Sequence, residues 1–130
     1  MNWKKWAVCV SVSALLLSAL LLAQDKKQLN QYGIAEKVTV NFGEPFRVGA
    51  TLLPKGDYEI THTMNGKDHI MVFRQLGVDK PIEVSAKCDL VKLDKAAPET
   101  RKNYVLNDAK ERVLKDMVIK GDTAKHVFEQ

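Results

Sequence analysis

The sequence contains little of what identifies many small proteins. Its 130 residues include only two cysteines, Cys9 and Cys88, and two tryptophans, Trp3 and Trp6. It has no Gly-rich phosphate-binding loop, no zinc-type cysteine spacing and no calcium-binding loop. Charges of both signs are interspersed, without a basic cluster interleaved with aromatic residues, so nothing supports nucleic-acid binding. A chain of this length has room for one modest domain.

Only the N-terminus carries a long apolar run. Residues 1–6 contain two lysines and no acid, and residues 7–23 are apolar or small throughout. This pattern predicts a signal peptide cleaved after Ala23, and therefore a periplasmic or extracellular protein. Leu21 is a poor match to the small residue expected before a cleavage site, and the run approaches the length of a membrane-spanning helix. The alternative is an uncleaved inner-membrane anchor, the sequence's one route to membrane contact.

Loss of residues 1–23 would change the charge and the thiol content. The rest of the chain keeps 18 of the 20 Lys and Arg residues and all 16 Asp and Glu residues, so the net charge falls from +4 to +2. Cys88 becomes the single thiol, and no internal disulfide can form, although an exported protein would permit one. Stability must then come from the core.

The remaining sequence divides into a polar spacer, residues 24–35, and a β-domain, residues 36–130. Residues 36–42 alternate apolar and polar side chains, as half-buried strands do. Further candidate strands follow at 46–54, 57–64, 67–76 and 82–93, and Gly49 indicates a bulge or a close approach in the first of these. Pro54-Lys55-Gly56-Asp57 and Asn65-Gly66 are the turn signals.

The C-terminal region admits two interpretations. Residues 108–120 fit a helix with Asp108 as its N-cap and Glu111 three residues later. The same region also fits a strand at 103–108, a turn, a strand at 112–121 and a last strand at 124–129. Local propensity favours the helix, whereas a sheet of short strands needs closing partners.

A short motif carries a resemblance. Leu53, Pro54, Gly56 and Tyr58 form the pattern Leu-Pro-x-Gly-x-Tyr. This region resembles the opening of a family of small secreted, mostly uncharacterised bacterial β-domains. The resemblance implies a small antiparallel barrel or sandwich of about seven to eight strands, and favours strands over the α+β alternative at the C-terminus. It implies no enzyme activity, cofactor or catalytic residue.

The stretch HTMNGKDHIM at residues 62–71 is the candidate site. A two-residue turn at Asn65-Gly66 places His62 opposite His69, with Met64 and Met71 on the same face. Imidazole and thioether ligands suit copper better than a hard cation. A turn spanning 65–68 instead places Met64 opposite His69 and His62 opposite Met71. The competing interpretation is an ordinary hairpin with an apolar floor.

Other reactive residues give weaker signals. Cys88 lies in a strand-like run on the face of Ala86 and Val84, where a cysteine acts as a small core residue. No nucleophile motif surrounds Cys88 or Ser85, and His126 is expected to be exposed.

The sequence therefore predicts a non-catalytic, exported all-β domain that acts as a binding or structural module at the bacterial cell envelope. Its partner would be an envelope protein or a small ligand. One alternative is a periplasmic copper-binding protein that uses His62, Met64, His69 and Met71. Another is a membrane-anchored accessory subunit of a larger envelope complex.

Overall fold

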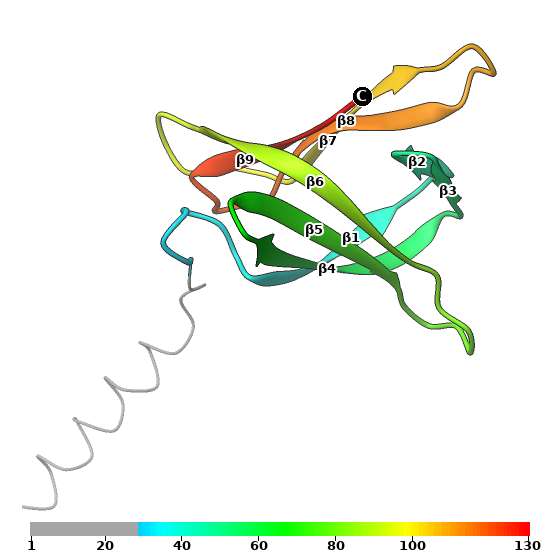
Figure 1. The fold of residues 1–130 in the computed structure, drawn as a ribbon, viewed down its shortest axis with the longest axis horizontal. Helices are drawn as coiled ribbons and strands as arrows, with labels where there is room; N and C mark the ends of the chain where they lie inside the picture. The colour runs from blue at the N-terminus through cyan, green and yellow to red at the C-terminus, as the bar shows by residue number, and fades with distance from the viewer. Residues whose placement is uncertain (1–28) are drawn as a thin grey trace, which may run out of the picture.

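The computed structural model describes residues 29–130, which form nine β-strands and no helix (Figure 1). The predicted leader, residues 1–23, lies outside the described residues. Among residues 29–130, no helix is long and apolar enough to cross a membrane. The strands are β1 (Lys37–Phe42), β2 (Phe46–Val48), β3 (Thr51–Leu53), β4 (Gly56–Asn65), β5 (Asp68–Gln75), β6 (Glu83–Lys92), β7 (Arg101–Leu106), β8 (Arg112–Val118) and β9 (Ala124–Phe128).

All nine strands belong to one curved sheet. The order is β1-β4-β5-β6-β9-β8-β2-β3, and β7 pairs with the other side of β8. Every pairing is antiparallel except β2 with β8. The sheet does not close, which corrects the predicted barrel, and it has more strands than the seven to eight expected. The edge strands β1 and β7 are joined by a side-chain contact, in which Lys102 Nζ of β7 donates a hydrogen bond to the Asn41 carbonyl of β1. No backbone ladder joins these two strands within residues 29–130.

One core lies inside the curved sheet. Phe42 of β1 stacks on Phe46 of β2 with ring centroids 3.9 Å apart, and Tyr58 of β4 meets both rings edge-on. Phe73 of β5 adds a further ring, and all four side chains are almost fully buried. Strands from both ends of the sheet thus share one apolar interior.

The Leu-Pro-x-Gly-x-Tyr motif has a structural role. Leu53 and Tyr58 are fully buried, and the Tyr58 hydroxyl donates a 2.6 Å hydrogen bond to the Pro54 carbonyl. Gly56 has φ +146°, a conformation that side-chain-bearing residues rarely adopt. The motif therefore fixes the corner between β3 and β4.

The β4–β5 hairpin has the second of the two predicted registers. Asn65 pairs with Asp68, Met64 with His69, and His62 with Met71, so the prediction that His62 opposes His69 is wrong. The central turn residues are Gly66 and Lys67, with φ +63° at Gly66. A glycine at the first central position is the requirement of a type II′ turn, and this places Asn65 in the ladder.

Two other elements differ from expectation. Residues 46–54 form a hairpin rather than one strand, because Gly49 (φ +59°) turns the chain between Val48 and Thr51. At the C-terminus the prediction of a helix at 108–120 is wrong. The region instead forms β7, β8 and β9, as the strand alternative predicts. Leu114, Met117 and Ile119 of this region lie in the core.

Candidate histidine–cysteine site

Two histidines meet on the inner face of the β4–β5 hairpin. The Nε2 atom of His62 lies 3.0 Å from Nδ1 of His69, and the ring centroids are 5.3 Å apart. Because the two residues are diagonal rather than opposite in the ladder, their rings lean toward one another across the strand pair. His62 is buried, and His69 is partly exposed. One of the two nitrogens carries the shared proton, and the other accepts it.

The two predicted methionines lie on the same face but in different surroundings. Met64 is directly opposite His69 and is 37% exposed. Met71 is opposite His62 and is 1% exposed, within the hydrophobic core. Of the four residues predicted from the sequence, His62, His69 and Met64 therefore lie at the rim of the interior, while Met71 contributes packing.

Tyr32 covers both histidines. Its ring centroid is 5.6 Å from that of His62 and 4.7 Å from that of His69, edge-on to the latter. A turn built on Asn30 holds this residue, because the Asn30 Oδ1 accepts a 2.9 Å hydrogen bond from the Tyr32 N–H. The chain then enters the domain through Ile34 and Ala35, which are buried. The described part of the predicted spacer thus packs against the sheet.

Contacts with the β8–β9 connection hold the Tyr32 segment in place. The Thr123 N–H donates a 2.7 Å hydrogen bond to the Gly33 carbonyl, and the Ala35 N–H donates to Asp122 Oδ1 at 3.2 Å. The cover over His62 and His69 is therefore fixed by residues about ninety positions away in the sequence.

Burial keeps the His62 imidazole neutral. Loss of solvent lowers the pKa of His62 below its usual value, and the neighbouring His69 lowers it further, against a smaller raising effect of Glu36. A neutral imidazole has one nitrogen lone pair free to bind a metal ion.

A second group of reactive side chains lies deeper in the same interior. The Cys88 Sγ atom of β6 is 3.9 Å from Nδ1 of His126 in β9, and both residues are almost completely buried. The other ring nitrogen of His126, Nε2, lies 4.0 Å from Oδ2 of the buried Asp122. The imidazole of His126 therefore has the thiol near one ring nitrogen and the carboxylate near the other.

Burial also controls ionisation in this second group. It raises the pKa of the Cys88 thiol to about 12, with a smaller contribution from Asp89. Burial lowers the pKa of His126 to about 4, assisted by the charges that His62 and His69 would carry. At neutral pH both side chains are uncharged.

The prediction that Cys88 lies in the core is confirmed, whereas the prediction that His126 is exposed is wrong. Ala124, His126 and Phe128 are the inward residues of β9, whereas Lys125 and Val127 are only partly buried. The sequence of β9 shows that alternate residues share a face, but it does not show which face is buried. Val127 is more apolar than His126, so the sequence favours the face of Val127. The inner face of the sheet thus holds all three histidines of the chain.

A pocket of about 500 Å³ opens beside this site. Its lining includes Tyr32, His69, Leu90, Lys92 and Thr123. His69 is therefore the histidine that solvent reaches. As the side chains lie, no three His, Cys, Asp or Glu residues in the described part are grouped closely enough to hold a metal ion.

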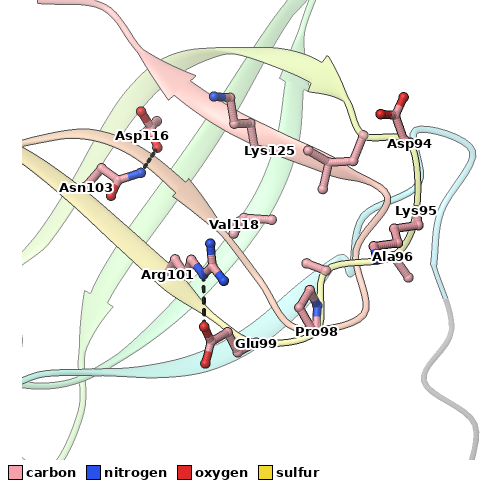
Figure 2. A pocket seen from close by; sticks show the side chains of 12 residues that line it. Asp94, Lys95, Ala96, Pro98, Glu99, Arg101, Asn103, Asp116, Val118 and Lys125 are labelled. Atoms are coloured by element: carbon pink, nitrogen blue, oxygen red, sulfur yellow. Dashed lines mark hydrogen bonds and ion pairs between the residues drawn. The ribbon is translucent and has the colours of Figure 1, made fainter.

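A second pocket, of about 570 Å³, lies on the other side of β9 (Figure 2). Its charged side chains are of both signs and partly paired, because Arg101 Nε donates to Glu99 at 3.0 Å and Asn103 Nδ2 donates to Asp116 at 2.7 Å. It contains no histidine or cysteine. Its chemistry is therefore less specific than that of the histidine–cysteine site.

Comparison with known proteins gives no further assignment. No protein-family model, no curated protein and no solved structure matches this chain.

Proposed function

We propose that the chain is a non-catalytic binding module of the bacterial cell envelope, and that it binds a soft transition-metal ion, with copper as the first candidate, at His62 and His69. The observation that carries this proposal is the 3.0 Å separation of the two imidazole nitrogens on the inner face of the hairpin. The export part of the proposal rests on the sequence of residues 1–23.

The distance between the nitrogens is close to what a shared ion requires. Two imidazole nitrogens bound at about 2.0 Å to one tetrahedral ion lie about 3.3 Å apart. The nitrogens of His62 and His69 therefore have to separate only slightly when an ion binds between them, after the ring that donates the hydrogen bond has moved its proton to its other nitrogen. Burial also lowers the pKa of His62, so that no charge on this ring has to be removed at neutral pH.

The neighbouring side chains favour a soft ion. The Met64 thioether is opposite His69 in the ladder, and thioether sulfur selects copper over hard cations such as magnesium or calcium. Glu36 is the one carboxylate that contributes to the shift of the His62 pKa, and its effect is the smallest of the three causes. Oxygen ligands, which calcium and magnesium need, are therefore poorly represented.

The state of Cys88 supports a non-catalytic role. A cysteine nucleophile reacts as the thiolate and must be reached by its substrate. The side chain of Cys88 is 1% exposed, and burial raises its thiol pKa to about 12. These properties suit a residue enclosed in a core.

A titration tests the proposal. We expect the purified protein to bind one Cu(I) ion per chain, as measured by competition with a chromophoric chelator. Binding of Cu(II) is measured in a separate titration under air. The double variant His62→Ala plus His69→Ala should lose this binding. Thr63→Ala is the matched control, because Thr63 lies between the two predicted ligands of β4 on the outer, exposed face. Equal binding by the double variant and the wild type would exclude the proposed site.

A further inference from the structure

We infer that the pocket on the outer face of β7, β8 and β9 binds a small aliphatic amino acid. Lys125 and Arg101 hold the carboxylate of this ligand, and Asp116 holds its ammonium group. The pocket contains no histidine and lies on the opposite face of the sheet from the histidine pair. The inference therefore goes beyond the proposed function and does not depend on it.

The pocket has a wall that is fixed by backbone hydrogen bonds. The connection after β6, residues 93–99, borders a volume of about 570 Å³ (Figure 2). Ala97 is buried and joins this connection to the β8–β9 turn, because its N–H donates to the Asp122 carbonyl at 2.9 Å and its carbonyl accepts from the Gly121 N–H at 2.8 Å. A preformed pocket of this size is typical of small-ligand sites.

The observation that carries the inference is a buried carboxylate without a cation. Asp116 is 9% exposed, and its Oδ1 atom accepts a 2.7 Å hydrogen bond from Asn103. Its carboxylate forms no ion pair within residues 29–130, although charged side chains are rarely buried unless they are paired. Because Asp116 lines the pocket, its other carboxylate oxygen can accept a hydrogen bond from a ligand ammonium group.

A half-buried cation without an anion lines the same pocket. The Lys125 ammonium forms no ion pair or hydrogen bond in the described part of the chain. Lys125 is two residues from Val127, the ladder partner of Asp116, and such diagonal neighbours lie about 7–8 Å apart. Lys125 and Asp116 do not pair with one another. One ligand that carries both charges can therefore contact both side chains.

Arg101 adds a second donor for the ligand carboxylate. It is the ladder partner of Val118, and Figure 2 shows the side chains of Arg101 and Lys125 on either side of Val118. The Nε atom of Arg101 donates to Glu99 at 3.0 Å, which leaves its two Nη groups for a ligand. Charge-assisted hydrogen bonds from two cations hold a carboxylate more strongly than neutral donors do.

The rest of the lining decides the class of ligand. The pocket has equal numbers of cationic and carboxylate side chains, which are Lys95, Arg101, Lys125, Asp94, Glu99 and Asp116. This balance favours a zwitterion over phosphate or a dicarboxylate. The apolar lining is aliphatic, with Leu93 and Val118 as its largest members, and offers no aromatic ring on which a nucleobase would stack. An amino acid with an aliphatic side chain matches the charges and the apolar lining together.

Calorimetric titration of the full exported protein with L-leucine at neutral pH tests the inference. We expect one leucine molecule to bind per chain. Two analogues separate the contacts, because isocaproate lacks the ammonium group of leucine and isoamylamine lacks its carboxylate. Each analogue should bind at least tenfold more weakly than leucine.

Substitutions test the same contacts from the side of the protein. Asp116→Asn removes the charge with little change of shape, and Lys125→Met removes the ammonium group but keeps an extended side chain. Each should reduce the affinity for leucine at least tenfold. Asp89→Asn and Lys115→Met are the matched controls and should bind leucine normally, because both residues are exposed and neither lines the pocket.

Three results would overturn the inference: no leucine binding by the wild type, equal affinity for leucine and an analogue, or normal binding by Asp116→Asn or Lys125→Met. The analogues need only the wild type, so they decide the question even if a variant fails to fold. Leucine binding should be unchanged in the His62→Ala plus His69→Ala variant, and copper binding unchanged in Asp116→Asn. The failure of either proposal therefore leaves the other intact.

Discussion

His126 shows how one buried side chain links stability to pH. Its side chain is fully buried, and its pKa of about 4 lies well below the usual value for histidine. Burial is the main cause, followed by the nearby His62 and His69. The folded protein therefore holds His126 neutral, whereas the unfolded chain takes up a proton at its ordinary pKa near 6.5.

We predict that the metal-free protein loses stability in acid through this residue. Between about pH 6.5 and pH 4 the unfolded state binds more protons than the folded state, so the free energy of unfolding falls as the pH falls. The whole loss attributable to His126 is about 3 kcal/mol. Urea denaturation at a series of pH values, with a chelator present, measures it.

A comparison with His126→Leu isolates this effect from other acid-sensitive groups. The variant keeps His62, and it keeps Glu111, whose pKa is lowered by the hydrogen bond from Arg47. Its stability should change less with pH than that of the wild type over the same window. Parallel curves for the two proteins would contradict the assignment.

At the scale of elements, the β4–β5 hairpin depends on the conformation of its turn. Gly66 occupies the first central position with φ +63°, and nothing lies within 4 Å of the place where a Cβ atom would stand. The requirement for glycine is therefore a matter of backbone conformation, without steric contact to a neighbouring side chain.

We predict that Gly66→Ala destabilises the protein by about 1–2 kcal/mol, the usual cost of a left-handed conformation for a residue with a Cβ atom. Gly43→Ala is the matched control, since Gly43 also has open space around its Cβ position but not a positive φ. Chemical denaturation of both variants measures the difference. A Gly66→Ala variant as stable as Gly43→Ala would show that the turn is not of this type.

The same hairpin shows what local sequence patterns predict. Alternation of Tyr58, Ile60, Met71 and Phe73 identified the buried face correctly, and all four are at most 1% exposed. The dipeptide Asn65-Gly66 identified the turn but not its centre, because both registers keep the same residues on the same face. Side-chain periodicity therefore fixes the face of a strand, while φ at Gly66 decides which residues pair.

Long-range pairing is the part of the fold that the sequence did not reveal. β6 pairs with β9, and β2 pairs in parallel with β8, although no local motif specifies either neighbour. The pairing of β6 with β9 is what brings His126 to Cys88. The candidate site was therefore predicted only in its hairpin half, because the other half depends on the order of strands in the sheet.

For the whole molecule, the curvature of the sheet relates the site to the core. β5 and β6 separate β4 from β9, yet His62 contributes to the lowered pKa of His126. Inner-face side chains of these strands therefore converge across the interior. The aromatic cluster of Phe42, Phe46, Tyr58 and Phe73 supports the same interior from the neighbouring part of the sheet.

The predicted export of the whole molecule has a spectroscopic consequence. Both tryptophans, Trp3 and Trp6, belong to the leader, whereas tyrosines such as Tyr32, Tyr58 and Tyr104 lie beyond Ala23. We predict that protein purified from the cell envelope begins at Gln24 and shows tyrosine emission without a tryptophan band. Intact mass and fluorescence measure this, and the same chain produced without export is the control that keeps its tryptophan emission. An envelope protein of full mass with a tryptophan band would instead establish residues 7–23 as a retained anchor, and copper binding would then be a property of a membrane-tethered domain.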